Sequence, residues 1–143
     1  MRGLADFLLE LEEYNGLLSS IKEGLGPVNV IGVSDSQKAH LIYSCCMHTE
    51  RQGIIITYDD MHARKIYEDL QFFAADGLKT YPSKELIFYG VEAYSTELIQ
   101  KRIAVLDLLC TSKKDIIVVT SIEAILQYTI PYEVYIKHKK HYK

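Results

Sequence analysis

The sequence lacks the features that would place it outside ordinary folded proteins. No apolar run approaches the ~18–20 residues that a membrane-spanning helix needs. The first ten residues carry Asp6 and Glu10 and lack a cationic lead followed by an apolar run, so they do not resemble a signal peptide. We find no internal repeat, low-complexity segment or linker. Of the 143 residues, 48% are hydrophobic and 24% are charged, which predicts one folded domain.

Cysteine is scarce, and its number is odd. We interpret the three cysteines as reduced thiols of a cytoplasmic protein: Cys45, Cys46 and Cys110. We expect no metal site, because the candidate ligands lack the paired spacing of a zinc site: Cys45, Cys46 and His48 in one segment, and His138 and His141 in another. Nucleophilic catalysis by Cys45 would need a base and an orienting group, and the sequence points to neither.

Positive charge is sparse over most of the chain. Sixteen basic and 19 acidic residues give a net charge of −3, but four lysines lie in the last seven residues: Lys137, Lys139, Lys140 and Lys143. Residues 1–136 therefore carry a net charge of −7. This acidic body argues against a free-standing nucleic-acid-binding protein. We interpret the basic tail as a solvated terminus. The chain stops within a strand-like segment, so we expect it to be a piece of a longer protein.

The first 26 residues predict a pair of short helices. Apolar residues of segment 4–11 recur at i, i+3, i+4 and i+7, opposite acidic residues. The Asn15-Gly16 pair predicts a break. A second apolar series over 17–25 then predicts a helix that ends at Gly24 or Gly26. We expect this helical pair, residues 1–26, to pack on the domain that follows.

From Pro27 onward, strand-like and helix-like segments alternate. Short apolar runs predict strands at 28–33, 53–58, 78–81 and 115–120, and the start of another at 131–136. The intervening segments predict helices at 37–49, 60–75, 95–109 and 122–129. Ile54-Ile55-Ile56 is apolar on both faces, as buried parallel strands are. Strands separated by helices predict βαβ units, so we expect residues 27–143 to form an α/β domain with a mostly parallel sheet.

The turn after the first predicted strand partly matches a phosphate-binding P-loop, G-x-x-x-x-G-K-[ST]. Gly32 and Lys38 have the right spacing, but Gln37 replaces the second glycine and Ala39 replaces the hydroxyl residue that binds magnesium. Asp35 adds a negative charge where an anion would sit. Two interpretations stay open: a degenerate P-loop, or an unrelated turn with a chance lysine.

Carboxylates and hydroxyls follow two other predicted strands. Asp59 and Asp60 could hold magnesium as a Walker B site does. We interpret them instead as local stabilisers of the next helix, with Asp60 as its cap and Asp59 as a favourable charge at its positive end. Strand 115–120 is followed by Thr120 and Ser121 without an Asp-Glu pair, and we interpret these two residues as a turn and a helix cap.

Several stretches share the order and spacing of one family's motifs. Tyr67 to Phe73, followed by Tyr81 to Leu86, matches a DL…FF…(Y/F)P…E run. Residues 94–102 resemble an SPE…..QRL..L helix, and residues 115–126 resemble an IVV.S..AL strand and helix. Pro131 falls where the family has a proline-containing turn. Over roughly residues 15–137, the chain resembles the amino-terminal region of bacterial transcription-repair coupling factors (Mfd).

This resemblance implies a fold and a function. The family's amino-terminal region is similar to the repair protein UvrB, so residues 27–143 would form a three-layer RecA-like (P-loop NTPase-like) domain. The loop from Gly32 to Ala39 would then be a P-loop that has lost its function. No catalytic residue carries over, and the fragment would be no enzyme and bind no cofactor. ATP and magnesium would act in separate motor lobes of the full-length protein, an ATP-dependent DNA translocase.

The resemblance also implies partners. The full-length protein would displace stalled RNA polymerase by movement along DNA and recruit nucleotide-excision-repair proteins such as UvrA. The present module would contact other domains of its own chain and no membrane. Two other functions stay open: the nucleotide-binding lobe of a UvrB-type DNA helicase, and a flavodoxin-like domain holding a small molecule at the carboxyl ends of its strands.

We expect the chain to bind duplex DNA weakly, because residues 1–136 carry a net charge of −7 and few cations oppose the phosphates. The measurement is a titration of labelled duplex at physiological salt, with a variant lacking the last seven residues for comparison. Micromolar affinity that survives this truncation would contradict the expectation.

Overall fold

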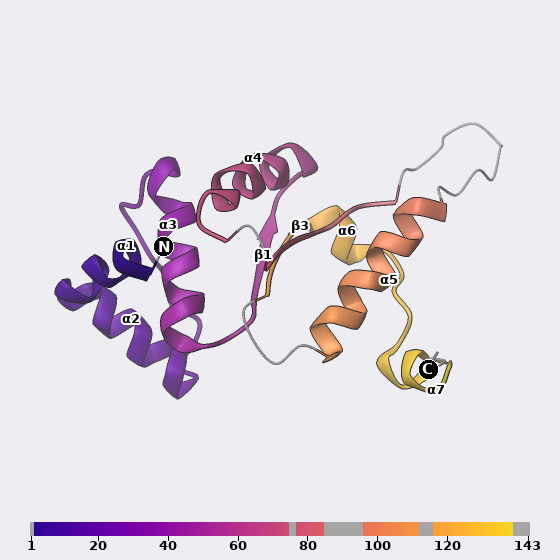
Figure 1. Cartoon of the computed structure of the whole chain (residues 1–143), viewed down its shortest axis with the longest axis horizontal. Coiled ribbons are helices and arrows are strands. Elements are labelled where there is room, and N and C mark those ends of the chain that lie inside the picture. The colour runs from indigo at the N-terminus through magenta and orange to yellow at the C-terminus, as the bar shows by residue number, and fades with distance from the viewer. Residues whose placement is uncertain (1, 75–76, 85–95, 112–115, 139–143) are drawn as a thin grey trace.

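The computed structural model describes residues 2–74, 77–84, 96–111 and 116–138 (Figure 1). At its centre lies a sheet of three parallel strands, β1 (Gly53–Thr57), β2 (Leu78–Tyr81) and β3 (Ile117–Ser121). The order β1-β3-β2 places β3 in the middle, where Val119 pairs with Ile55 on one side and with Thr80 on the other. The predicted α/β fold with a parallel sheet is therefore confirmed.

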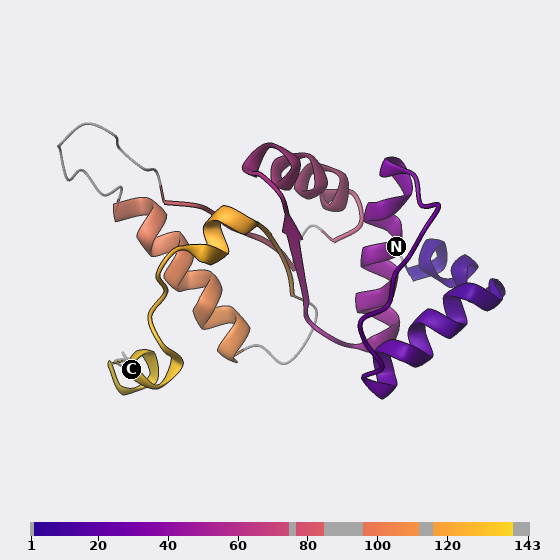
Figure 2. The same cartoon turned by 180° about the vertical axis from the view of Figure 1, so that it is seen from behind.

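Helices cover both faces of this sheet (Figures 1 and 2). Helices α3 (Asp35–Thr49) and α4 (Asp60–Gln71) pack on one face, over a buried core of Ala39, Leu70, Leu78, Ile117 and Val119. Helices α5 (Thr96–Thr111) and α6 (Ile122–Leu126) pack on the other face, over Tyr81, Val105, Ile116, Val118 and Ala124. Successive residues of β3 alternate between the two cores, so this strand is buried on both sides.

Strand β1 forms an edge of the sheet, and this position changes its burial. Ile55 packs in the core beneath α3 and α4, but Ile54 is 57% exposed and Ile56 is 55% exposed. The expectation of a strand buried on both faces is therefore wrong. The helices of the second face contact β2 and β3, which leaves the apolar side chains of β1 on that face in contact with water.

Residues 28–33, predicted as the first strand, form no strand, so this prediction is wrong. The segment is an irregular connection between the second and third helices, and Ile31 is 84% exposed. β-propensity largely reflects packing on a pleated, half-buried surface. In the described sheet this segment has no neighbouring strand, so its β-branched residues gain no such packing. The turn at Gly32 consequently lacks the preceding strand that a P-loop requires.

Residues 132–136 belong to helix α7 (Tyr132–His138) and Pro131 precedes it, so the strand predicted at 131–136 is also wrong. The Tyr135 N–H donates to the Pro131 carbonyl at 2.9 Å, and the Tyr135 hydroxyl donates to Asp107 of α5 at 2.6 Å. Proline suits a helix start because the N–H that it lacks has no partner there. Helices α4 and α6 also end earlier than predicted, at Gln71 and Leu126.

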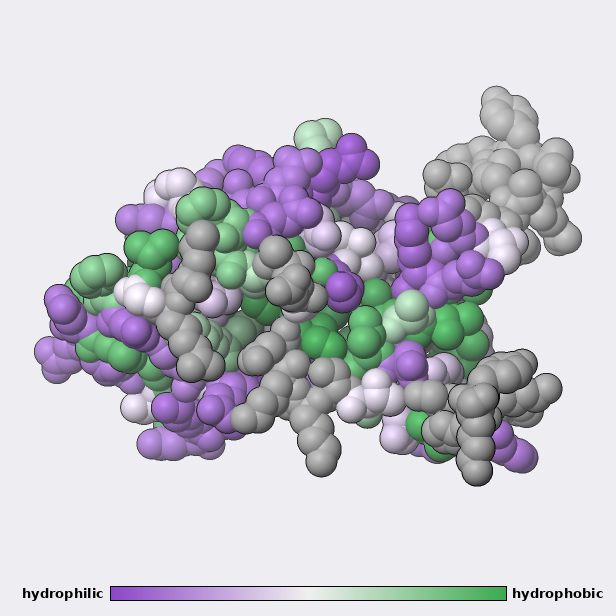
Figure 3. Space-filling model, viewed as in Figure 1, coloured by the Kyte–Doolittle hydropathy of each residue, from purple (hydrophilic) through white to green (hydrophobic). Residues whose placement is uncertain are grey.

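Three helical segments are described before α3: α1 (Arg2–Asp6), a 3₁₀ turn η1 (Phe7–Glu10) and α2 (Glu12–Glu23). Both α1 and α2 contact α3, and Tyr14 and Leu18 of α2 are buried. Figure 3 shows apolar residues at the surface of this region, whereas α4 presents a hydrophilic outer face. Within the described residues, the helices are too short or too polar to cross a bilayer.

Helix α2 starts earlier than predicted but ends where predicted. Asn15 and Gly16 lie inside the helix, so the break predicted there is wrong. The Asn15 side-chain amide donates to the carbonyls of Leu9 at 2.8 Å and Leu11 at 3.0 Å, and thereby fixes the start of α2. The predicted end at Gly24 is confirmed, since Gly24 takes a left-handed conformation with φ of +72°.

We expect Gly16→Ala to raise the free energy of unfolding by about 1 kcal/mol, because alanine favours a helix interior and the space beside Gly16 is open. Gly24→Ala should lower it by about 1–2 kcal/mol, because a Cβ is strained at positive φ. Urea unfolding of both variants checks this pair. A destabilised Gly16→Ala variant would contradict the continuous helix.

Candidate functional site

The P-loop-like turn forms the N-terminus of α3. Gly32 takes a left-handed conformation with φ of +84°, and Ser34 is the N-cap residue of the helix. The Ser34 N–H donates to Oε1 of Gln37 at 3.2 Å, which completes a capping box. Gln37, at the position of the second P-loop glycine, thus stabilises the helix start.

The lysine of the turn is already paired. Lys38 Nζ lies 2.7 Å from Oδ1 of Asp35, and Lys65 of α4 lies 3.7 Å from the other oxygen of the same carboxylate. The hydrogen bond from Lys38, followed by its charge, holds the pKa of Asp35 below its ordinary value. A phosphate approaching Lys38 would therefore meet the negative charge of Asp35 beside it.

Ala39, at the position of the magnesium-binding hydroxyl, lies in the core. It is 2% exposed and belongs to the cluster that includes Leu70 and Ile117. A hydroxyl at this position would be buried among apolar side chains rather than presented to a metal ion. The structure therefore places Gly32, Gln37, Lys38 and Ala39 in one turn, but it turns Gln37 and Lys38 toward local partners and Ala39 toward the core.

The carboxylates after β1 serve the next helix. Asp59 is the N-cap of α4 and accepts from the His62 N–H at 2.7 Å and from His62 Nδ1 at 2.9 Å. Asp60, in the first turn, accepts from the Ser83 hydroxyl. The interpretation as helix stabilisers is confirmed, with Asp59 rather than Asp60 in the cap position.

The hydroxyl residues at the end of β3 also stabilise the structure around them. Ser121 caps α6 by accepting from the Ala124 N–H at 3.2 Å, as predicted. Thr120 remains within the strand, where its hydroxyl donates to the Tyr81 carbonyl at 2.8 Å. The turn predicted at Thr120 is therefore wrong, because β3 extends to Ser121 and α6 begins at Ile122.

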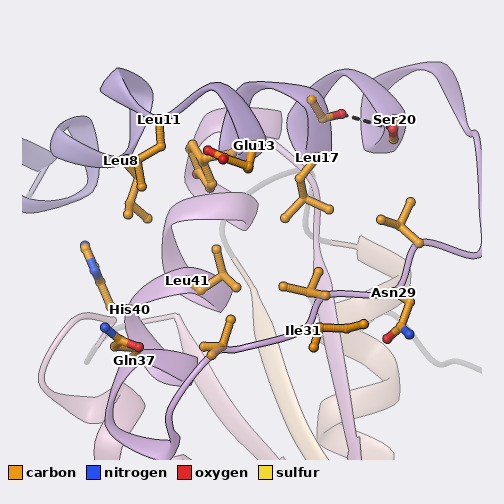
Figure 4. Close-up of a pocket in the computed structure, with 15 residues that line it drawn as sticks. Leu8, Leu11, Glu13, Leu17, Ser20, Asn29, Ile31, Gln37, His40 and Leu41 are labelled. Atoms are coloured by element: carbon orange, nitrogen blue, oxygen red, sulfur yellow. Dashed lines mark hydrogen bonds between the residues drawn. The ribbon is translucent and has the colours of Figure 1, made fainter.

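An apolar groove of about 550 Å³ lies between α2, residues 28–33 and α3 (Figure 4). Leu17 of α2 and Leu41 of α3 point into it, and Ile31 lines the third side. Apolar side chains provide most of the lining, and the polar lining residues include neither lysine nor arginine: Glu13, Tyr14, Ser20, Asn29, Gln37 and His40. Such a lining suits an apolar side chain and offers no concentration of positive charge for a nucleotide.

A second cavity, of about 540 Å³, lies beside α4 at the carboxyl ends of β2 and β3. Open α/β sheets commonly bind ligands at this edge. Here the cavity is lined by Arg64, but also by Asp60 and Glu68, together with hydroxyls of Thr80, Thr120 and Ser121. Two carboxylates against one guanidinium oppose the binding of a polyphosphate.

Cys45 and Cys46 lie on α3 in a partly buried position. Burial raises the pKa of Cys45, and burial together with the neighbouring Cys45 raises the pKa of Cys46 to about 11. A raised pKa opposes a nucleophilic role. The described residues contain no group of three His, Cys, Asp or Glu side chains that could hold a metal ion, and His141 lies outside them.

The sequence interpretation missed two polar clusters. The Tyr14 hydroxyl is hydrogen-bonded to His48 Nδ1 at 2.8 Å, and His48 Nε2 lies 3.2 Å from Asp6, which links the three helices α1, α2 and α3. The second cluster surrounds Arg102 of α5, a buried guanidinium. A signal for Arg102 exists in the sequence, since it continues the apolar stripe of Leu98 and Val105 at helical spacing.

The comparisons with known proteins give one distant relative. The chain is 27% identical over 136 residues to the transcription-repair-coupling factor of Bacillus subtilis (strain 168). The matched region covers 94% of this chain and 12% of the relative. No family model and no solved structure matches the chain. The chain therefore has a weak similarity to one segment of a transcription-repair-coupling factor.

We expect Cys110 to react first with a thiol reagent such as DTNB at pH 8, because it is exposed while the pKa of Cys46 is raised from 9.0 to about 11. This shift leaves roughly 100-fold less Cys46 thiolate at pH 8. The neutral Cys46 thiol stabilises the fold fully below pH 9, and this contribution is lost as the pH rises toward 11.

The measurement is the release of the coloured thiolate over time, with Cys110→Ser as the control. That variant should lose the fast phase and keep the slow ones. A fast phase that persists in Cys110→Ser would show that a thiol of α3 is accessible, against the burial described.

Proposed function

We propose that the chain is a non-catalytic module of a transcription-repair coupling factor, with a RecA-like fold similar to the first domain of UvrB. Two observations support this proposal. The similarity to the Bacillus relative extends over 94% of the chain. A parallel sheet with helices on both faces is the architecture that a RecA-like lobe requires. In this proposal residues 1–26 are a helical pair that packs on the lobe formed by residues 27–143.

The geometry of the turn at the N-terminus of α3 carries the non-catalytic part of the proposal. A working P-loop needs a free lysine and a row of backbone N–H groups that converge on phosphate. Lys38 is instead bound to Asp35 at 2.7 Å, and Gln37 is bound to the Ser34 backbone. Removing one preorganised charge-stabilising group commonly costs about 3 kcal/mol in a transition state, and several are missing here.

In this proposal the module acts as a scaffold that packs against other domains of a longer chain. The exposed apolar residues of β1, Ile54 and Ile56, and those of the N-terminal segment, Phe7 and Leu11, are suited to packing against other domains of a longer chain. ATP and magnesium belong, in this proposal, to separate motor lobes of that chain. RNA polymerase, UvrA and DNA are partners of the full-length protein, which acts in the cytoplasm.

We expect no binding of magnesium-ATP with a dissociation constant below about 10 μM, which corresponds to roughly −7 kcal/mol. Calorimetric titration of the unaltered chain is the test. The double variant Gln37→Gly with Ala39→Thr should gain weak phosphate affinity at most. It should also unfold more readily, because its new hydroxyl is buried in the core.

Asp35→Asn is the matched control, because it frees Lys38 without changing the shape of the turn. This variant should also fail to bind the nucleotide, since the converging N–H groups are still missing. Tight binding to the unaltered chain, with hydrolysis, would instead favour the nucleotide-binding lobe of a UvrB-type helicase.

A further inference from the structure

Arg102 carries a positive charge in the interior, and the part of the chain that the structure describes gives it no negative partner. It is 4% exposed, and its described acceptors are all uncharged. Nη1 donates to the carbonyls of Pro82 at 2.7 Å and Ala124 at 3.2 Å, and Nη2 donates to the Thr129 hydroxyl at 3.3 Å. Burying an ion is costly unless a charge or a full set of hydrogen bonds compensates it. Within the described residues, Nη2 has this single acceptor, the Thr129 hydroxyl, for its two hydrogens.

A second cation stands close to this guanidinium. The backbone N–H of Lys84 and Nη1 of Arg102 both donate to Oε1 of Gln127, at 2.6 and 3.5 Å. Lys84 Nζ donates to the Tyr128 carbonyl at 3.1 Å, which is again a neutral acceptor. Lys84 and Arg102 thus share the Gln127 acceptor, Lys84 through its backbone and Arg102 through its side chain. No described carboxylate forms an ion pair with either residue.

Both cations line one cavity of about 110 Å³ beyond the end of β2. The Tyr81 ring lies 4.1 Å from the Arg102 guanidinium carbon and fixes the guanidinium plane by a cation–π contact. The other walls are Ile99, Ile103, Leu106, Tyr128, Thr129 and Ile130. Neither Asp nor Glu is among these lining residues. The cavity is therefore locally positive in a chain whose net charge is −3.

We propose that this cavity binds a small organic carboxylate. The anionic head fits between Arg102 and Lys84, where it supplies a counter-charge and a second acceptor for Nη2. A short alkyl chain fits against the isoleucine and leucine side chains of α5. The apolar wall favours a carboxylate with a hydrocarbon tail over inorganic phosphate, which would leave that wall unfilled and most of its own oxygens unpaired.

The test is an NMR titration of the full chain with sodium butyrate at constant ionic strength, read from the side-chain Nε–H signal of Arg102. We expect a saturable shift of this signal. Butanol, which has the tail without the charge, and inorganic phosphate, which has the charge without the tail, should give at least tenfold weaker binding. Lys84→Met should weaken butyrate binding at least tenfold.

Lys101→Met is the matched control, because Lys101 neighbours Arg102 in sequence but is exposed and pairs with Glu97 at 2.7 Å. It should bind butyrate as the parent chain does. A shift that does not saturate, equal weakening in both variants, or phosphate binding as tight as butyrate binding would each overturn the proposal. Lys84 is not in the hydrophobic core, so the result for Lys84→Met does not depend on the survival of a core substitution.

Discussion

Strand β3 is removed from water on both faces, so its backbone groups depend on the strands beside it for their hydrogen bonds. The Ile116 carbonyl accepts from Gly53 at 2.9 Å, and the Ile117 N–H donates to the Gly77 carbonyl at 3.0 Å. These bonds align β1 and β2 in parallel with β3. They bring the ends of the three strands to one edge of the sheet, where Asp59 and Ser121 start helices α4 and α6. The second cavity and the Arg102 cluster lie at this edge because β3 has fixed its neighbours.

Two cations of this molecule have opposite environments. Lys38 lies on the surface and is neutralised by Asp35 within its own helix, although its position in the sequence is that of a phosphate-binding lysine. Arg102 lies in the interior, and among the described residues its polar contacts are carbonyls, a hydroxyl, an amide oxygen and an aromatic ring. The sequence motif therefore points to the cation whose charge a neighbouring carboxylate neutralises. The uncharged surroundings of Arg102 become evident only when the packing is known.

The sequence predicts most of the sheet and its helices because their signals are local. The apolar runs at β1, β2 and β3 and the stripes of α3, α4 and α5 need no knowledge of neighbours. The segment 28–33 shows where this fails. Its β-branched residues favour a strand as much as Ile54 to Ile56 do. Strand formation also requires a neighbouring strand to pair with, and the local sequence does not show whether one is present. The helix at 132–138 was missed for a related reason, since Tyr135 is held by Asp107, which is 28 positions away in the chain.

The same limit applies to the candidate site. The sequence predicted that the carboxylates after β1 serve the helix, because capping is a local interaction. It did not predict that Gln37 completes a capping box or that Ala39 faces the core, since motif comparison treats both positions only as departures from a P-loop. The contact between Tyr14, His48 and Asp6 joins residues 34 and 42 positions apart, and no spacing rule predicts it.

The exposed edge of β1 has a consequence for the behaviour of the chain in concentrated solution. Gly53–Thr57 contains no charged residue and no proline, which are the usual means by which an edge strand avoids pairing with another molecule. Ile54 and Ile56 are about half-exposed, so two copies that met along this edge would both gain backbone hydrogen bonds and apolar contact. Such pairing needs no unfolding. A protein surface that covered β1 would therefore protect the solubility of the chain more than the stability of its fold.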